Sequence, residues 1–115
     1  MHTLAFNPAD KTALASGGDD SSIKLWNFKT GELLRIFRGH SRSVRSVAVS
    51  ENGKLLASGG QDETVRVWNL STGALIGVLS SHLAPVNSVA ISPDGEAIAS
   101  GSDDMTLKIW QPGQM

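Results

Sequence analysis

The sequence predicts an all-β protein built from three similar repeats, and two observations support this prediction. First, the three tryptophans, Trp26, Trp68 and Trp110, recur every 42 residues, and a serine and an aspartate before each of them keep the same step. A fixed period in this range indicates a repeat architecture rather than an ordinary globular domain. Second, short apolar runs separated by turns fill each repeat, and no segment shows sustained helical spacing of apolar residues.

Each repeat is predicted to contain up to four short strands, and the second repeat shows them in order. Its strands are expected at residues 47–49, 55–58, 64–68 and 75–79. Turn-forming dipeptides or single glycines separate them, namely Asn52-Gly53, Gly59-Gly60 and Gly73. In the third strand polar and apolar residues alternate, as in a strand with one exposed face. The first strands of the three repeats are similar, because they read TLAFN, SVAVS and SVAIS.

Composition narrows the class of protein. The chain has 115 residues and a mass of 12.1 kDa, with 40% hydrophobic and 18% charged residues, which suits a folded protein. Its net charge is −1, whereas proteins that bind nucleic acids usually carry an excess of basic residues. No apolar run approaches the roughly 20 residues that span a bilayer, and the start MHTLAFNPAD does not resemble a signal peptide. We therefore expect a cytoplasmic protein without nucleic-acid or membrane partners, and the absence of cysteine excludes disulfides.

Histidine joins the repeat, since His40 and His82 are also 42 residues apart and each stands 28 residues before a tryptophan. With histidine, serine, aspartate and tryptophan recurring together, the chain resembles the WD40 repeat family from about Thr3 to Trp110. The resemblance implies four-stranded antiparallel blades that pack radially into a β-propeller. The innermost strand of each blade is called a and the outermost d.

The resemblance divides the chain into blade 1 at residues 1–38, blade 2 at 39–80, blade 3 at 81–111 and a tail at 112–115. Blade 3 should lack its outer strand. Closed propellers typically have 4 to 8 blades, so three blades leave both flanking faces apolar and uncovered, with one strand edge unpaired. We expect a partial propeller that is open unless other WD40 repeats of a longer protein, or other copies of this chain, complete the ring.

The resemblance also implies a structural network in each blade, in which aspartate and serine bind the two imidazole nitrogens and the indole N–H donates to serine. Its expected members are His40, Ser58, Asp62 and Trp68 in blade 2, His82, Ser100, Asp104 and Trp110 in blade 3, and Ser16, Asp20 and Trp26 in blade 1. Blade 1 lacks the histidine, because His2 aligns with Arg45 instead. Similar residue types form the hydrolytic triad, but a constellation repeated in several blades favours the structural role.

Propellers of this family usually bind partners on the face where the loops into strand a meet the loops between strands b and c. The matching positions are Ser43, Arg45, Pro85, Asn87, Asp19, Gln61 and Asp103, with His2 as the counterpart of Arg45 in blade 1. These positions differ between blades, and variation on a constant scaffold can encode specificity. The alternative interpretation is that they are ordinary solvated loop residues.

Two clusters of charge allow other interpretations. The four arginines Arg35, Arg38, Arg42 and Arg45 predict either a receptor for carboxylates or phosphates or a solvated edge that discourages strand aggregation. The acidic pairs Asp19-Asp20 and Asp103-Asp104 lack further oxygen ligands nearby and an EF-hand pattern. No metal or other cofactor is therefore expected.

Three functional classes remain open at this stage. The first is a non-enzymatic scaffold that presents its loop face to protein or peptide partners. The second is a hydrolase or lyase of the propeller type, which should show a unique polar cluster on the inner strands, whereas these strands repeat. The third is a purely structural segment that completes a larger assembly. The first is preferred, although fold analogy alone does not decide function.

Overall fold

The computed structural model describes residues 3–80 and 82–111, which form eleven β-strands and no helix. The strands are β1 (Thr3–Phe6), β2 (Ala13–Gly17), β3 (Ser22–Asn27), β4 (Glu32–Arg38), β5 (Val44–Val49), β6 (Leu55–Gly60), β7 (Val65–Asn69), β8 (Leu75–Leu79), β9 (Val86–Ile91), β10 (Ile98–Ser102) and β11 (Leu107–Trp110). They make three antiparallel sheets with the orders β1-β2-β3-β4, β5-β6-β7-β8 and β11-β10-β9. The predicted all-β fold with blades of four, four and three strands is therefore confirmed.

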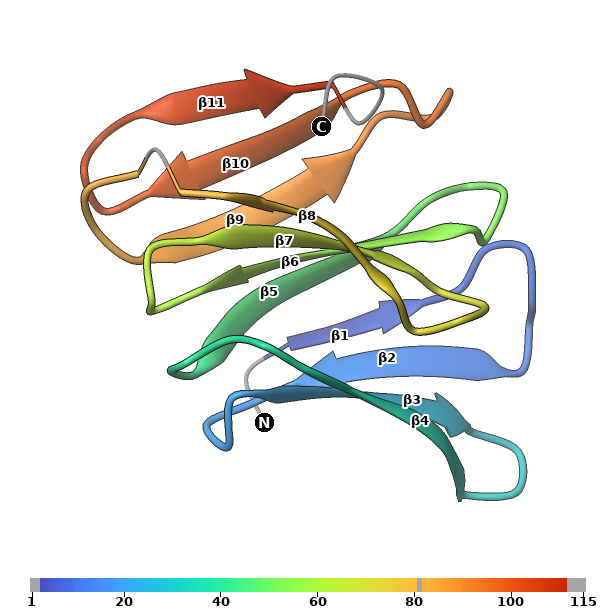
Figure 1. Ribbon diagram of the computed structural model, residues 1–115. Coiled ribbons are helices and arrows are strands. Elements are labelled where there is room, and N and C mark those ends of the chain that lie inside the picture. Colours follow the sequence, from blue (N-terminus) through green and yellow to red (C-terminus); the bar gives the residue numbers. More distant parts are fainter. Residues whose placement is uncertain (1–2, 81, 112–115) are drawn as a thin grey trace.

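The three sheets follow one another in space as they do in sequence (Figure 1). Strand β5 packs against both β1 and β9, so the first strands of the blades form the line along which the sheets meet. A side-chain oxygen of one blade reinforces this line by accepting a hydrogen bond from a backbone N–H of the next. Thr3 Oγ1 accepts from Val47 N at 3.2 Å, and Ser46 Oγ accepts from Val89 N at 3.1 Å. Because Thr3 and Ser46 occupy equivalent register positions, the contact repeats from blade to blade.

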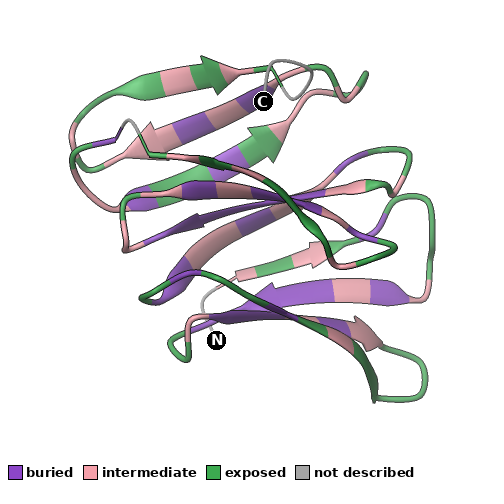
Figure 2. Cartoon of the chain, viewed as in Figure 1, coloured by how far each residue is buried: buried purple, intermediate pink, exposed green. Residues whose placement is uncertain are grey.

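Two apolar layers lie between the sheets. The first joins Ile23, Leu25 and Phe37 of blade 1 to residues of blade 2 that include Leu56 and Trp68. The Phe37 and Trp68 rings meet edge to face, with centroids 5.6 Å apart. The second joins Ala57, Val65 and Val67 of blade 2 to Val86, Val89 and Ile98 of blade 3. Blade 2 is thus covered on both faces, and the buried residues concentrate between neighbouring sheets (Figure 2).

Glycine permits the close approach of neighbouring blades. A Cβ atom at Gly17 would lie 2.6 Å from Val44 Cγ1, and one at Gly59 would lie 2.6 Å from Val86 Cγ1. At Gly101, the equivalent position of blade 3, a Cβ atom would meet nothing within 4 Å. Within the described residues, this face of blade 3 therefore has no neighbour.

Both outer faces are apolar and exposed, as the sequence predicts. Leu107 and Ile109 of β11 are 70% and 63% exposed, whereas Val65 and Val67, which precede them by one repeat, are fully buried. On the opposite side of the molecule, Leu4 and Phe6 of β1 are 54% and 64% exposed. Each outer face therefore presents side chains that, in the interior blade, form an apolar layer.

Candidate functional site

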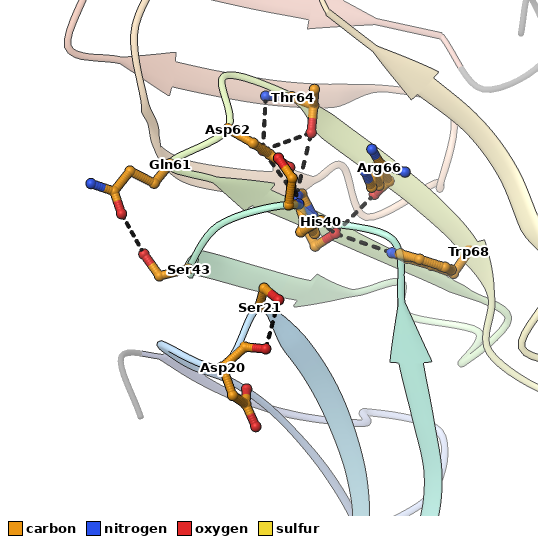
Figure 3. A network of polar contacts seen from close by, with 11 residues as sticks. Asp20, Ser21, His40, Ser43, Gln61, Asp62, Thr64, Arg66 and Trp68 are labelled. Carbon is orange, nitrogen blue, oxygen red and sulfur yellow. Dashed lines mark hydrogen bonds and ion pairs between the residues drawn. The ribbon is translucent and has the colours of Figure 1, made fainter.

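The blade 2 network is centred on a buried histidine, His40, which lies in the loop between β4 and β5 (Figure 3). Its Nδ1 lies 2.9 Å from Asp62 Oδ2, and its Nε2 lies 2.7 Å from Ser58 Oγ. The Trp68 indole N–H donates to the same serine oxygen at 3.0 Å. A consistent proton arrangement has Nδ1–H donating to the carboxylate while Ser58 donates to Nε2. The network thus ties the incoming loop to strands β6 and β7.

Blade 3 repeats this arrangement one period later. His82 Nδ1 lies 3.2 Å from Asp104 Oδ2, and His82 Nε2 lies 2.7 Å from Ser100 Oγ. Trp110 Nε1 donates to Ser100 Oγ at 2.9 Å. In blade 1 the corresponding bond from Trp26 Nε1 to Ser16 Oγ is also 2.9 Å long. The structure therefore joins all four predicted residues in blades 2 and 3, whereas in blade 1 it joins Ser16 to Trp26 and places Asp20 in a pocket that these two residues also line.

Sequence reasoning missed a hydroxyl residue two positions after each network aspartate. Ser22, Thr64 and Thr106 each donate a backbone N–H and a side-chain O–H to that carboxylate. The signal was available, because these residues also recur every 42 positions. Between aspartate and hydroxyl lies a residue with left-handed backbone, Ser21, Glu63 or Met105, with φ between 64° and 71°. Because these three residues are of different types, the sequence alone does not indicate the left-handed conformation at this position.

Burial and hydrogen bonding set the charge states of the network. Burial lowers the pKa of His40 below its ordinary value of 6.5, although the Asp62 carboxylate acts in the opposite direction. Burial raises the pKa of Asp62, but hydrogen bonds from Thr64, His40 and the Ser41 N–H outweigh it, so that the pKa lies below 3.8. The short His40–Asp62 contact is therefore a neutral imidazole bound to a carboxylate rather than a full ion pair.

These pKa directions predict how stability depends on pH. The folded state holds His40 neutral, so the unfolded state binds more protons below pH 6.5, and the free energy of unfolding should fall as the pH drops from 6.5 to 5. Asp62 contributes in the same direction only at lower pH, near 3.8. Urea unfolding of wild type and His40→Gln at pH 8, 6.5 and 5 measures this effect. The variant should show a shallower decline, and equal slopes for the two proteins would contradict the assignment.

The network geometry bears on the triad interpretation. Ser58 and Ser100 are 0% and 1% exposed, and each hydroxyl is held between an imidazole and an indole. A nucleophile needs an approach path for its substrate and donors for an oxyanion. Neither serine offers such a path. The arrangement is suited to holding a blade together.

A second polar site lies on the face where the loops into strand a meet the b–c turns. Asp19, Ser43, Arg45, Gln61 and Asn87 line a common pocket with a volume of about 420 Å³. Ser43 Oγ donates to Gln61 Oε1 at 2.9 Å (Figure 3). Arg45 Nη1 donates to Asn87 Oδ1 at 2.6 Å and thereby links blades 2 and 3. Residues predicted separately in three blades thus contribute to one surface.

The remaining residues predicted for this face lie around the pocket. Asp103 accepts a hydrogen bond from Asn87 Nδ2 and lies 3.7 Å from Arg45 Nη1. The Pro85 carbonyl accepts the backbone N–H of Asp103 at 3.0 Å, so Pro85 shapes the turn without lining the pocket. His2, the predicted counterpart of Arg45, lies outside the described residues, as does the tail at 112–115.

The arginine cluster predicted from the sequence does not form a single anion receptor. Arg35 donates to the carbonyls of Ser71 and Thr72 at 2.9 and 2.8 Å, and so links β4 to a turn of blade 2. Arg45 lies in the loop-face pocket, whereas Arg35 lines a different one. The positions diverge because strand β4 carries its residues from one end of the sheet to the other.

The described residues contain no group of three or more histidine, aspartate or glutamate side chains placed to hold a metal ion. In the same part of the chain, no helix is long and apolar enough to cross a membrane.

Comparison with known proteins agrees with the geometry. The family described as "WD domain, G-beta repeat" matches residues 2–27, 31–69 and 73–111. Nuclear distribution protein nudF of Aspergillus flavus is 45% identical over 47 residues, which are 41% of this chain and 10% of the relative. Nuclear distribution protein PAC1 of Coprinopsis cinerea is 39% identical over 59 residues, 47% of this chain and 14% of the relative. WD40 repeat-containing protein HOS15 of Arabidopsis thaliana is 42% identical over 50 residues, 44% of this chain and 8% of the relative.

The alignments thus span only about a tenth of each of these curated relatives. The family match, by contrast, extends over nearly all of the present chain and divides it into three repeats, in agreement with the three sheets. The chain therefore belongs to the WD40 repeat family.

Proposed function

We propose that the chain is a non-enzymatic protein-interaction scaffold that presents its loop face to protein or peptide partners. The observation that carries this proposal is the loop-face pocket, in which residues from all three blades converge. The framework beneath it is nearly constant, since the serine, aspartate and tryptophan recur in each blade and the histidine in blades 2 and 3, while the residues that line the pocket differ. WD40 repeats and relatives such as nudF and PAC1 support an interaction role at this general level.

Blade boundaries at residues 38/39 and 80/81 are part of the same proposal, with blade 3 ending at 111. So is completion of the ring, either by further WD40 repeats of a longer protein or by other copies of this chain. The exposed apolar faces of blades 1 and 3 support it, because exposed contiguous apolar surface usually marks an interaction site. A cytoplasmic location without nucleic-acid or membrane partners is also proposed, and cell fractionation tests it.

The alternatives have less support. For a hydrolase, the hydroxyls of the repeated histidine-serine pairs would need access to substrate, and Ser58 and Ser100 are buried. A purely structural segment would need no convergent polar surface, yet three blades build one. A scaffold accounts for both the buried network and the variable rim.

Alanine substitution of the pocket tests the interaction role. The triple variant Arg45→Ala, Gln61→Ala and Asn87→Ala should recover less of the partners that the wild-type chain binds in native lysate. Its affinity for them should fall by about tenfold or more, because each 1.4 kcal/mol of binding free energy removed corresponds to a factor of about ten. The matched control replaces Lys29, Glu51 and Glu96 by alanine. These three residues are exposed in turns at the opposite end of the strands. Both variants should keep the far-UV circular dichroism of the wild type. Unchanged recovery of all partners by the folded pocket variant would contradict a binding rim.

A further inference from the structure

A pocket with a volume of about 250 Å³ lies between blades 1 and 2, at the end of the strands opposite the loop face. It is bordered by strand β4 and by the turns that join β1 to β2, β5 to β6 and β7 to β8. These turns lie on the right of the view in Figure 1. Both blades have four strands at this place. The pocket therefore belongs to the boundary between two complete blades and not to either outer face.

The floor of this pocket is apolar. Ala13, Leu25 and Leu70 line it, and all three are buried members of the apolar layer between the two blades. One repeat after Ala13, blade 2 has the larger residue Leu55. The alanine thus leaves space that a leucine would fill, and this space suits an aliphatic group.

One wall carries an amide whose N–H groups have no partner. Asn7 is 8% exposed, and its Oδ1 accepts the Ala9 N–H at 3.0 Å, which fixes the orientation of the amide. No described residue accepts a hydrogen bond from Asn7 Nδ2. At the equivalent register position of blade 2, Ser50 donates its hydroxyl to Asn52 at 2.7 Å. Because buried polar groups are normally hydrogen-bonded, Asn7 Nδ2 favours an acceptor supplied by a ligand.

A second wall carries a positive charge that is held in place. Arg35 donates from Nη1 to the Thr72 carbonyl at 2.8 Å and from Nη2 to the Ser71 carbonyl at 2.9 Å. These carbonyls do not neutralise the charge, and no carboxylate of the described residues forms an ion pair with Arg35. The guanidinium keeps further N–H groups for another acceptor. A carboxylate is the preferred partner of such a group.

A negative charge at the rim restricts the ligand further. Asp10 lines the same pocket and is exposed in the β1–β2 turn. Its Oδ1 accepts the backbone N–H and the hydroxyl of Thr12, and these bonds lower the pKa of Asp10 below 3.8. Among the described residues, none is bound to Oδ2. An ionised carboxylate attracts an ammonium group and repels a simple anion, so the pocket favours a ligand that carries both charges.

These groups are not part of the framework that the blades share. At the boundary between blades 2 and 3, the equivalents of the two charged residues are Asn52 and Gly77, and the equivalent of Ala13 is Leu55. Neither the charges nor the small floor residue is therefore needed to pack one blade against the next. Residues that differ on a constant scaffold are candidates for binding.

We infer that this pocket binds a free aliphatic α-amino acid. Its carboxylate would bind Arg35 and Asn7 Nδ2, its ammonium group would bind Asp10, and its side chain would cover the apolar floor. The lining includes one positive and one negative side chain, so a zwitterion matches its charge. The volume lies just below the roughly 300 Å³ at which sites for drug-sized ligands begin, which suits a molecule of this size. The inference is independent of the loop-face pocket and of the proposed interaction role.

Titration of the full 115-residue chain with four small probes tests the inference. L-leucine has all three groups, isocaproate lacks the ammonium group, isopentylamine lacks the carboxylate, and glycine lacks the aliphatic side chain. The readout is the side-chain amide resonance of Asn7 in a ¹H–¹⁵N spectrum, assigned with Asn7→Ser. Leucine should shift it saturably with a Kd of about 1 mM, and each other probe should bind about tenfold more weakly or less. No shift with leucine in a well-dispersed spectrum, or equal binding of any other probe, would overturn the proposal.

A matched pair of variants isolates the charge at the rim. Asp10→Asn introduces the residue that blade 2 has at this position, where Asn52 still accepts the Lys54 N–H at 3.0 Å, so the turn should persist. It should weaken leucine binding by about tenfold and leave the affinity for isocaproate equal or higher. Asp94→Asn makes the same change in the equivalent exposed turn of blade 3 and should affect neither ligand.

The variants also give results that would contradict the assignment. Unchanged leucine binding by Asp10→Asn, or equal weakening of leucine binding by Asp10→Asn and Asp94→Asn, would overturn a zwitterionic ligand at this pocket. Proportional weakening of leucine and isocaproate by Asp10→Asn would do so as well, because it would indicate a merely structural role. The probe series needs no substitution at the rim, so it decides even if Asp10→Asn does not fold.

Discussion

Replacing Trp68 by alanine should lower the free energy of unfolding by about 3–5 kcal/mol, the usual cost of removing a large buried aromatic side chain. Trp68 is 2% exposed, packs edge to face against Phe37 of blade 1 and donates to Ser58. Its loss would open a cavity between two blades and leave the serine without its indole partner. For a chain whose total stability is expected to lie near 5–15 kcal/mol, this is a large fraction.

Trp26 provides the internal control for this prediction. It makes the same hydrogen bond, to Ser16, at nearly the same distance. Its ring, however, belongs to the outer face of blade 1, where it lines an exposed apolar hollow with Leu4 and Phe28. Trp26→Ala should therefore cost clearly less than Trp68→Ala in urea unfolding followed by far-UV circular dichroism, when both are measured in a Leu107→Lys and Ile109→Lys background in which copies do not associate. Equal losses would show that packing between blades is not what distinguishes the two tryptophans.

The period of the sequence predicts the architecture well, because each blade needs the same residues to close its own network. In every blade the tryptophan follows the register partner of the serine by two positions on the neighbouring strand, so their 42-residue spacing translates directly into register. Strand ends were less predictable. The strand expected at 55–58 continues to Gly60, because Gly59 and Gly60 pair with Ser46 and Val44 of β5. From the sequence alone, two adjacent glycines predict a turn, and only the pairing with the neighbouring strand shows that they extend β6.

The candidate site could be predicted only in part, for a similar reason. Sequence alignment of the repeats places Arg45, Gln61 and Asn87 on one face, but their mutual contacts depend on the angle between blades. The bond from Arg45 to Asn87 joins residues 42 positions apart and becomes visible only in three dimensions. Arg35 and Arg45 are another example. They are close in sequence and were predicted as one cluster, but in the structure they line different pockets.

The second large effect concerns the outer faces of blades 1 and 3. Val65 and Val67 of blade 2 are fully buried against blade 3, and their equivalents Leu107 and Ile109 are exposed. On the other side, Leu4 occupies the register position of Val47, which blade 1 covers. The outer face of blade 3 is therefore apolar at the positions where blade 2 packs against the blade that follows it. The outer face of blade 1 is likewise apolar at the positions where blade 2 packs against the blade that precedes it.

Head-to-tail contact between copies is expected from this match. The contact would bury Leu107 and Ile109 of one copy against the blade 1 face of another, as the two internal layers already do within the chain. The Leu107→Lys and Ile109→Lys double variant places two charges in this contact and should abolish it, since burial of unpaired charge is strongly unfavourable. Because both positions are exposed within a single chain, the variant should retain its fold.

The mass of the purified 115-residue chain in sedimentation velocity tests the central claim, that these blades require neighbours on both outer faces. The wild-type chain should sediment as a dimer or larger assembly, and the double lysine variant as a monomer of 12.1 kDa. A wild-type chain that sediments only as the 12.1 kDa monomer and unfolds cooperatively would contradict the claim.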